Sequence, residues 1–216
     1  MVIQPFEEYW REYDEWYDKH RALYYSELMA VELASHGVPR PWLEIGVGTG
    51  RFAAPLRIDV GVDPSEAMLK VAISRGLHVV KAYAERLPFL DSSFGGVFII
   101  YTICFLDDPV QALREVSRVL ADHGKLVLGF ISADSDWGRF YQELAVKGHR
   151  FFKHAKFYTV SQVEDLLRET GFKPVLYIST LTVNKPGLPE VYEDPVVGLK
   201  RGAGFVVIRA QKINTL

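Results

Sequence analysis

The sequence predicts an α/β fold in which an open, doubly wound sheet carries helices on both faces. From residue 42 onward, short apolar runs alternate with amphipathic segments that have helical spacing. This alternation is typical of strand–helix–strand units joined by right-handed crossovers. The runs are continuously apolar, as expected for strands that helices cover on both sides. A chain of 216 residues has the size of one domain with a full core.

The first 40 residues predict a helical cap with one aromatic face. Aromatic and aliphatic residues recur there at spacings of three and four, with acidic residues between them. They are Phe6, Tyr9, Trp10, Tyr13, Trp16, Tyr17, Leu23 and Tyr24. A glycine and two prolines in the segment HGVPRP, residues 36–41, end this helical region.

Residues 42–131 predict a ligand-binding core of strands and helices. Helices are expected to begin near Arg51, Ser65 and Pro109, the last with Asp108 as its N-cap. The expected strands are residues 42–47, 58–62, 78–82, 96–102 and 125–130.

Residues 132–158 predict an irregular, aromatic-rich insertion, and residues 159–216 predict a helix followed by strands. Thr159 or Ser161 caps that helix, and Gly171 ends it.

Two further strands are expected at residues 174–183 and 204–210, which brings the total to seven. The intervening segment, residues 184–203, is rich in proline and glycine. Loops of this length inside a compact domain are usually mobile or functional.

Composition narrows the class of protein. The net charge is −2 and no dense Lys/Arg run occurs, which argues against nucleic acid as a partner. Cys104 is the one cysteine and cannot form an internal disulfide, as expected in a reducing cytoplasm. The acidic first 20 residues do not resemble a signal peptide, and the longest apolar run, residues 95–106, is too short to span a bilayer. We expect a cytoplasmic monomer or homodimer with no membrane association.

Three glycines follow the first expected strand in the motif WLEIGVGTGRF, residues 42–52. Gly46, Gly48 and Gly50 permit positive φ and let a ligand approach the main chain. The dinucleotide fingerprint G-x-G-x-x-G/A is absent, because the spacing here is G-x-G-x-G with Arg51 next. This difference weighs against NAD, and an ordinary tight turn remains an alternative.

Asp63 ends the second expected strand, beside the glycine turn if the strands are adjacent. A carboxylate in this position can accept hydrogen bonds from a ribose 2′,3′-diol and would repel a 2′-phosphate. The alternative is that Asp63 caps the following helix, a role that Ser65 can also fill.

Five motifs in order and register resemble those of class I S-adenosylmethionine-dependent methyltransferases, in the branch that modifies small molecules. They are LEIGVGTGRF, GVDPS followed by Met68, AERLPF, SF and REVSRVLADHGKLVLG. The resemblance covers residues 42–130 and continues weakly to the end of the chain. It implies a mostly parallel, Rossmann-like sheet of seven strands with an antiparallel last strand.

The resemblance also implies S-adenosylmethionine as the cofactor and a set of contacts to it. Glu44 and the turn of Gly46, Gly48 and Gly50 would lie against the methionine part, and Asp63 would hold the ribose. Pro64, Met68, Ala84 and Glu85 would lie around the adenine, and Tyr101 under the cofactor. Two departures from the family pattern are Tyr83, where an acid is common, and Gly95, where the family often has aspartate.

Methyl transfer from a sulfonium is an in-line displacement that requires positioning and a dry pocket but no metal. None of the six histidines has metal-ligand spacing, and no catalytic residue is assigned. A general base is useful only if the acceptor must lose a proton, and His149, His154 and Asp107 are candidates.

A small-molecule acceptor pocket is expected outside the core sheet. Its candidate residues are Tyr9, Tyr13, Trp16 and Tyr17 of the cap, Phe105, and the aromatic insertion at residues 137–157. The alternative for the cap is that these rings only dock the helix on the sheet. Other functional alternatives are a protein or nucleic-acid acceptor, a non-catalytic cofactor-binding protein and an NAD(P)-dependent oxidoreductase.

Overall fold

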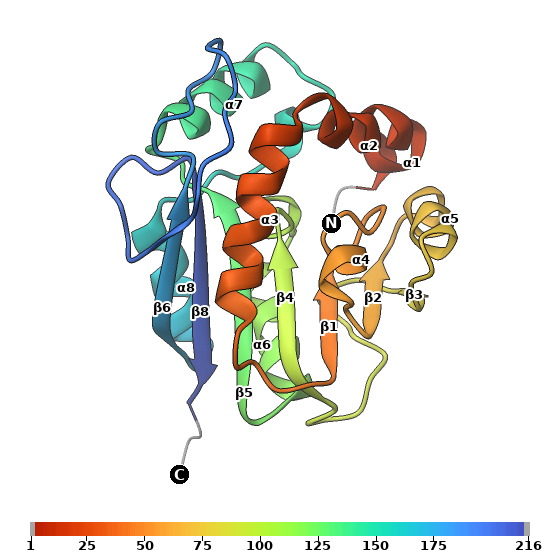
Figure 1. The fold of residues 1–216 in the computed structure, drawn as a ribbon. Coiled ribbons are helices and arrows are strands. Elements are labelled where there is room, and N and C mark those ends of the chain that lie inside the picture. Colours follow the sequence, from red (N-terminus) through yellow and green to blue (C-terminus); the bar gives the residue numbers. More distant parts are fainter. Residues whose placement is uncertain (1–2, 214–216) are drawn as a thin grey trace.

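The computed structural model describes residues 3–213, which form one twisted sheet between two layers of helices (Figure 1). In this part of the chain the sheet has eight strands in the order β3-β2-β1-β4-β5-β8-β6-β7. Neighbouring strands from β3 to β5 pair in parallel, and β8 runs antiparallel to both β5 and β6. The bounds are β1 Trp42–Ile45, β2 Val60–Asp63, β3 Val79–Lys81, β4 Phe94–Ile100, β5 Leu120–Ile131, β6 Phe172–Thr180, β7 Val196–Val197 and β8 Phe205–Lys212. The predicted α/β fold class is confirmed.

The order of the strands reverses between β1 and β4. From β1 the chain adds β2 and β3 on one side, then crosses over to add β4 and β5 on the other. Loops that leave the two central strands therefore diverge at their carboxyl ends. Doubly wound folds bind ligands in the crevice that this reversal opens.

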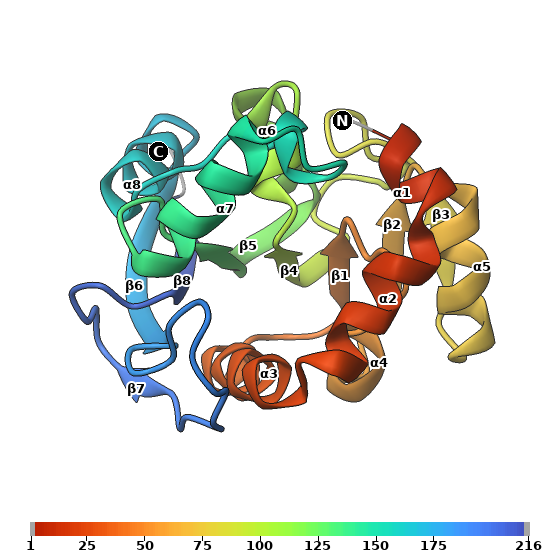
Figure 2. The same cartoon turned by 90° about the horizontal axis from the view of Figure 1, so that it is seen from above.

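Helices cover the sheet as the continuous apolar strands predict. In Figure 2, α3 (Arg21–Ser35) and α4 (Ala53–Leu56) lie on one face, and α6 (Pro109–Val119) and α8 (Val160–Glu169) on the other. Alternate strand residues point to opposite faces. Leu43 packs in the cluster that contains the buried side chains of α6 and α8, whereas Phe98 packs in the cluster that contains those of α3. Helix α5 (Glu66–Ser74) follows β2.

The N-terminal cap is divided where a single helical face was expected. Tyr9 (φ −116°, ψ 28°) and His20 (φ −113°, ψ 48°) leave helical geometry and separate α1 (Gln4–Glu8), α2 (Trp10–Lys19) and α3. Figures 1 and 2 show α1 and α2 above the carboxyl ends of the strands, while α3 lies along the sheet. The aromatic residues therefore serve two purposes, since those of α2 cover the crevice and those of α3 fill the core.

The prediction of an irregular insertion at residues 132–158 is wrong over its first half. Helix α7 (Asp136–Val146) begins there because the Ser135 hydroxyl accepts a hydrogen bond from the Gly138 amide at 2.9 Å. The 3-10 turn η2 (Phe152–His154) follows, and η1 (Ile103–Phe105) lies after β4.

Local capping signals predict the remaining helix starts well. The carboxylate of Asp108 caps α6 by accepting from the Gln111 amide at 2.9 Å. Thr159, and not Ser161, caps α8, where it forms a capping box with Gln162. The helix expected near Arg51 is the short α4. The loop at residues 184–203 contains β7, a strand beyond the seven that were expected.

Among residues 3–213 we find no helix that combines the length and the apolar character needed to cross a bilayer.

Candidate active site

The three glycines turn the chain sharply at the end of β1. Gly46, Gly48 and Gly50 have φ of 72°, 52° and 82°, which residues with a Cβ rarely adopt. A Cβ on Gly46 would lie 2.1 Å from Oγ1 of Thr102. The Gly46 amide donates to the carbonyl of Val62 at 2.8 Å, so the turn is fastened to the end of β2.

Asp63 joins the glycine turn to the start of α5. Its Oδ2 accepts from the Gly48 amide at 3.0 Å, and its Oδ1 accepts from the Ser65 amide at 2.8 Å. The Ser65 hydroxyl caps α5 by accepting from the Met68 amide at 3.2 Å. Burial raises the pKa of Asp63 to about 6, although the two amides oppose the shift. The carboxyl oxygens keep lone pairs for further donors.

Glu44 places a second carboxyl close to this turn. Glu44 is only 2% exposed. Burial, and then the charge of Asp63, raises the pKa of Glu44 well above its usual range. Its Oε2 accepts no hydrogen bond from the described residues. A buried carboxyl oxygen without a donor is costly, so this atom is available to a bound group or a water molecule.

A small cavity of about 40 Å³ lies at the crevice beside Asp63. Five of the ten residues that the resemblance assigns to the cofactor line it, and they are Gly46, Gly48, Asp63, Met68 and Tyr101. The other five, Glu44, Gly50, Pro64, Ala84 and Glu85, do not line it. Ala84 is fully buried in the core, and a Cβ on Gly50 would lie 2.4 Å from Leu77, so this glycine shapes the turn.

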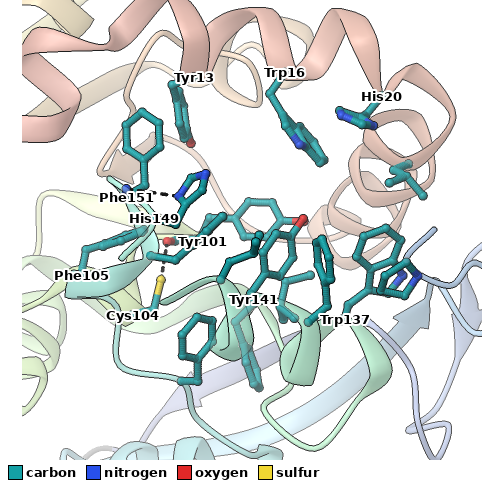
Figure 3. A pocket seen from close by; sticks show the side chains of 18 of the residues that line it. Tyr13, Trp16, His20, Tyr101, Cys104, Phe105, Trp137, Tyr141, His149 and Phe151 are labelled. Atoms are coloured by element: carbon teal, nitrogen blue, oxygen red, sulfur yellow. Dashed lines mark hydrogen bonds between the residues drawn. The ribbon is translucent and has the colours of Figure 1, made fainter. Parts of the chain in front are cut away.

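A larger cavity of about 390 Å³ adjoins the first and is lined mostly by aromatic side chains (Figure 3). Its walls come from α2, the end of β4, α7, η2 and the loop before β7. Four residues line both cavities and lie between them: Phe6, Tyr13, Tyr101 and Phe105.

The structure brings four of the five predicted acceptor residues to the large cavity. Tyr13, Trp16, Tyr17 and Phe105 line it. Tyr9 does not, since it is 39% exposed and its ring lies under the Arg150 guanidinium, 4.2 Å from the ring centroid.

The proline- and glycine-rich loop forms part of the same wall. Pro186, Leu188 and Glu190 line the cavity. The Glu190 carboxylate is hydrogen-bonded to Nδ1 of His20, the N-cap residue of α3. The Asn184 side chain holds the loop by bonding to the Val191 backbone at 2.9 and 3.0 Å.

The candidate bases lie in different places. His149 lines the large cavity, and burial lowers its pKa. His154 and Asp107 line neither cavity. The described residues contain no cluster of three or more His, Cys, Asp or Glu side chains suited to a metal ion.

Comparison with known proteins places this geometry in a family. The sequence profile of the methyltransferase domain matches residues 43–128. An uncharacterized protein of Methanocaldococcus jannaschii is 40% identical over 98% of this chain and 100% of its own length. A Thermotoga maritima crystal structure, described as a "SAM-dependent methyltransferase, possible histamine N-methyltransferase", is 40% identical with a TM-score of 0.90, over 97% of this chain and 98% of that one.

The chain belongs to the S-adenosylmethionine-dependent methyltransferases. The class I assignment made from the sequence motifs is confirmed. An O-methyltransferase of Aspergillus sclerotiorum is a more distant relative, 28% identical over 61% of this chain and 54% of its own.

The methyltransferase has cavity residues that sequence patterns alone did not single out. Glu190 and His20 are two such residues. Trp137 and Tyr141 also line the large cavity, and their spacing of four residues places them on one face of α7. The position of Glu190 depends on the path of a long loop, for which no local signal exists.

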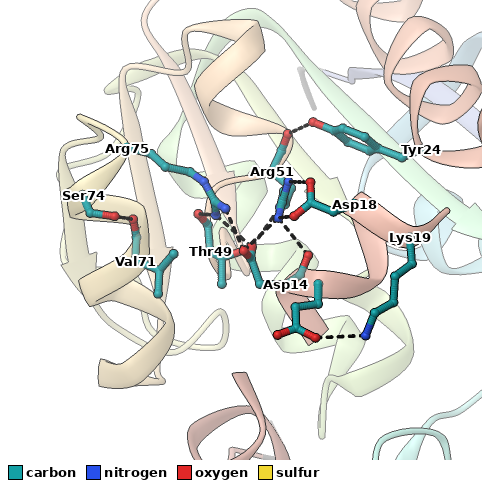
Figure 4. Close-up of polar contacts among 10 residues, drawn as sticks. Asp14, Asp18, Lys19, Tyr24, Thr49, Arg51, Val71, Ser74 and Arg75 are labelled. Carbon is teal, nitrogen blue, oxygen red and sulfur yellow. Dashed lines mark hydrogen bonds and ion pairs between the residues drawn. The ribbon is translucent and has the colours of Figure 1, made fainter. Parts of the chain in front are cut away.

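An ion-pair network holds α2 of the methyltransferase over the glycine turn (Figure 4). Asp14 on α2 pairs with both Arg51 and Arg75 at 2.8 Å. The Arg75 guanidinium also donates to the carbonyl of Thr49 inside the turn at 2.5 Å. Burial disfavours the ionised form of Asp14, but the arginine hydrogen bonds outweigh it and hold its pKa below the usual range. Asp18 adds a more exposed contact to Arg51.

Asn in place of Asp14 should lower the free energy of unfolding by about 3 kcal/mol, because two partly buried guanidinium groups lose their carboxylate. Asp18→Asn is the matched control and should cost less than about 1 kcal/mol, since Asp18 is 66% exposed. The depressed pKa means that the Asp14 contribution is present above about pH 4 and is lost as the pH falls. Urea unfolding at several pH values measures both effects, and equal losses in the two variants would contradict the assigned role.

Glu44→Gln should make the methyltransferase more stable relative to wild type as the pH rises. The folded-state pKa of Glu44 is raised, so its stabilising contribution is complete below about pH 4.5 and is lost as the pH rises toward that pKa. The wild type should lose up to about 1.4 kcal/mol per pH unit that the Gln variant does not lose. Urea unfolding at pH 5 and 7.5 measures the difference, with the exposed Glu32→Gln as control. Parallel pH profiles for wild type and Glu44→Gln would show that Glu44 ionises normally.

Proposed function

We propose that this methyltransferase transfers the methyl group of S-adenosylmethionine to a small organic acceptor held in the large aromatic cavity. One observation carries the proposal: the aromatic cavity of about 390 Å³ shares a wall with the crevice formed by the glycine turn and Asp63. This volume lies within the range of pockets that take small molecules.

The residues at the crevice fit the cofactor. The Asp63 carboxylate has lone pairs left for ribose hydroxyls, and its burial strengthens such charge-assisted hydrogen bonds. Gly48 has no Cβ, so a ligand can approach its main chain. The protein atom nearest to the position that a Cβ would take is a ring carbon of Tyr13, 3.8 Å away. The unpaired Oε2 of Glu44 suits the amino group of the methionine part, directly or through water. Pro64, Met68, Ala84 and Glu85 are assigned to the adenine side by family resemblance.

Cofactor entry requires rearrangement of the N-terminal cap. The cavity beside Asp63, at about 40 Å³, is far smaller than pockets that hold ligands of this size. Phe6 and Tyr13 line it from α1 and α2 and are the side chains whose displacement would join the two cavities. The ion pairs of Asp14 with Arg51 and Arg75 would then re-form and hold α2 over the bound cofactor.

The cofactor supplies an electrophilic methyl group on a sulfonium. The protein contributes alignment and exclusion of water. Trp16, Phe151 and their aromatic neighbours offer flat apolar faces to a ring and can also attract a cationic amine. Enclosure of this cavity by α2, α7 and the loop at residues 186–190 favours a small acceptor over a protein or nucleic acid.

The name of the Thermotoga maritima relative points to an amine nitrogen as acceptor, and that of the Aspergillus sclerotiorum relative to an oxygen. Both chemistries suit a cavity of aromatic rings edged by His20, Glu190 and Lys156. A panel of arylalkylamines and phenols incubated with donor carrying a labelled methyl group tests the proposal. Transfer to at least one member is expected; cofactor binding without transfer to any would contradict a small aromatic acceptor.

Asp63→Ala should weaken S-adenosylmethionine binding by at least about tenfold at pH 7.5, because a charge-assisted contact to the ribose is lost. Wild-type affinity should also fall as the pH drops below about 6, where Asp63 takes up a proton. Isothermal titration calorimetry measures both. Asp122→Ala, an exposed residue elsewhere in the chain, should leave affinity unchanged; unchanged affinity in Asp63→Ala would remove the ribose assignment.

Trp16→Ala should raise the KM for the acceptor by about tenfold with little change in cofactor affinity, because it removes one aromatic face from the large cavity only. Trp10→Ala provides the matched control on the same helix, since Trp10 lines neither cavity. Steady-state kinetics with the best acceptor of the panel measures the effect. A change in cofactor affinity alone, or equal effects of both variants, would place the acceptor elsewhere.

A further inference from the structure

Tyr101 occupies an unusual position at the junction of the two cavities. It is a non-glycine residue with φ of 59°, immediately after β4. Outliers of this kind persist where the surroundings enforce them and cluster at functional sites. Its amide donates to the carbonyl of Gly129 at 2.9 Å, and its carbonyl accepts from Sγ of Cys104 at 3.1 Å.

The ring of Tyr101 is held as firmly as its backbone. Phe205 lies 5.1 Å from it and Phe52 lies 6.0 Å from it, measured between ring centroids. The side chain lines both the crevice beside Asp63 and the aromatic cavity, as Figure 3 shows for the latter. A group at this junction would touch both a methyl donor and an acceptor.

Glu27 lies behind Tyr101 on α3. Glu27 is 1% exposed, and its carboxyl group is hydrogen-bonded to the Tyr101 side chain. The second carboxyl oxygen, Oε2, has no hydrogen-bond partner within residues 3–213. Burying a carboxyl group that has one hydrogen-bond partner costs free energy. The packing of α3 on the sheet therefore does not by itself explain a glutamate at this position.

Four titratable side chains interact electrostatically with Glu27. They are Tyr101 after β4, Tyr17 on α2, Tyr141 on α7 and Glu190 on the loop. Glu190 is itself bonded to His20. Three phenols and a carboxylate do not neutralise a negative charge. Burial, and to a lesser extent the charge of Glu190, raises the pKa of Glu27 to about 8, against the opposing hydrogen bond from Tyr101.

We propose that the Tyr101 hydroxyl is the catalytic group that takes the acceptor's proton during methyl transfer, and that Glu27 is the positioning residue that orients and polarises it. This assignment rests on the proposed function.

In the step, a lone pair of the acceptor N–H or O–H attacks the methyl carbon. The carbon–sulfur bond breaks, and its electron pair stays on sulfur, which becomes a neutral thioether. The acceptor's proton moves to the Tyr101 oxygen as the Tyr101 proton moves to the Glu27 carboxylate. The products are the methylated acceptor, S-adenosylhomocysteine and a protonated Glu27, which releases its proton to solvent when the site opens.

The pH dependence of the chemical step tests the assignment. The step needs ionised Glu27, so the wild-type single-turnover rate should rise by about tenfold per pH unit up to about pH 8 and then level off. Glu27→Gln should flatten this profile and lower the rate at pH 9 by about a hundredfold, and Tyr101→Phe should do the same. Cofactor affinity should stay within about threefold in both variants. Glu27→Asp should restore part of the slope, and Glu32→Gln, exposed on the same helix, should retain the wild-type profile.

The measurement uses the full chain with the best acceptor of the amine and phenol panel, and circular dichroism confirms that each variant is folded. A wild-type profile in Glu27→Gln, or a full rate in Tyr101→Phe, would overturn the assignment and leave the proposed function intact. A wild type that binds cofactor but methylates no panel member would overturn the proposed function, and this assignment with it.

Discussion

The hydrogen bond between the Asp63 carboxylate and the Gly48 amide is the contact on which the rest of the site depends. It joins the turn after β1 to the end of β2, and the Ser65 amide on the other carboxyl oxygen extends the link to α5. The glycines make the turn possible, and the parallel pairing of β1 with β2 brings the two ends together. A rigid main-chain surface and a buried acceptor of hydrogen bonds are thus set at the reversal point of the sheet.

The N-terminal cap is built onto this framework through charge. Arg51, which directly follows the glycine turn, and Arg75, at the end of α5, converge on Asp14 of α2. The same helix presents Tyr13, Trp16 and Tyr17 to the large cavity. One network therefore aligns a wall of the large cavity with the crevice beside Asp63. The residue that departs from the dinucleotide fingerprint, Arg51, has a structural use in the cap that a small residue could not supply.

Sequence patterns predicted the features that depend on local physics. The strands and the N-cap of Asp108 follow from apolar runs and backbone donors a few residues away. The site features that required long-range contacts were missed. His20 and Glu190 meet across 170 positions, and Glu27 meets a tyrosine that follows β4. The break at Tyr9 was hidden because the aromatic spacing continues through it, and the helix at Asp136–Val146 was hidden among irregularly spaced aromatic residues.

We propose that the glycine turn and Asp63 form the nucleoside site of this methyltransferase. A crystal structure grown with S-adenosylhomocysteine tests it most directly. We expect the ribose hydroxyls on the Asp63 carboxylate, the amino-acid end along residues 46–50, and Phe6 and Tyr13 displaced from their present positions. Density for the nucleoside elsewhere, with the Asp63 crevice still closed by those two rings, would contradict it.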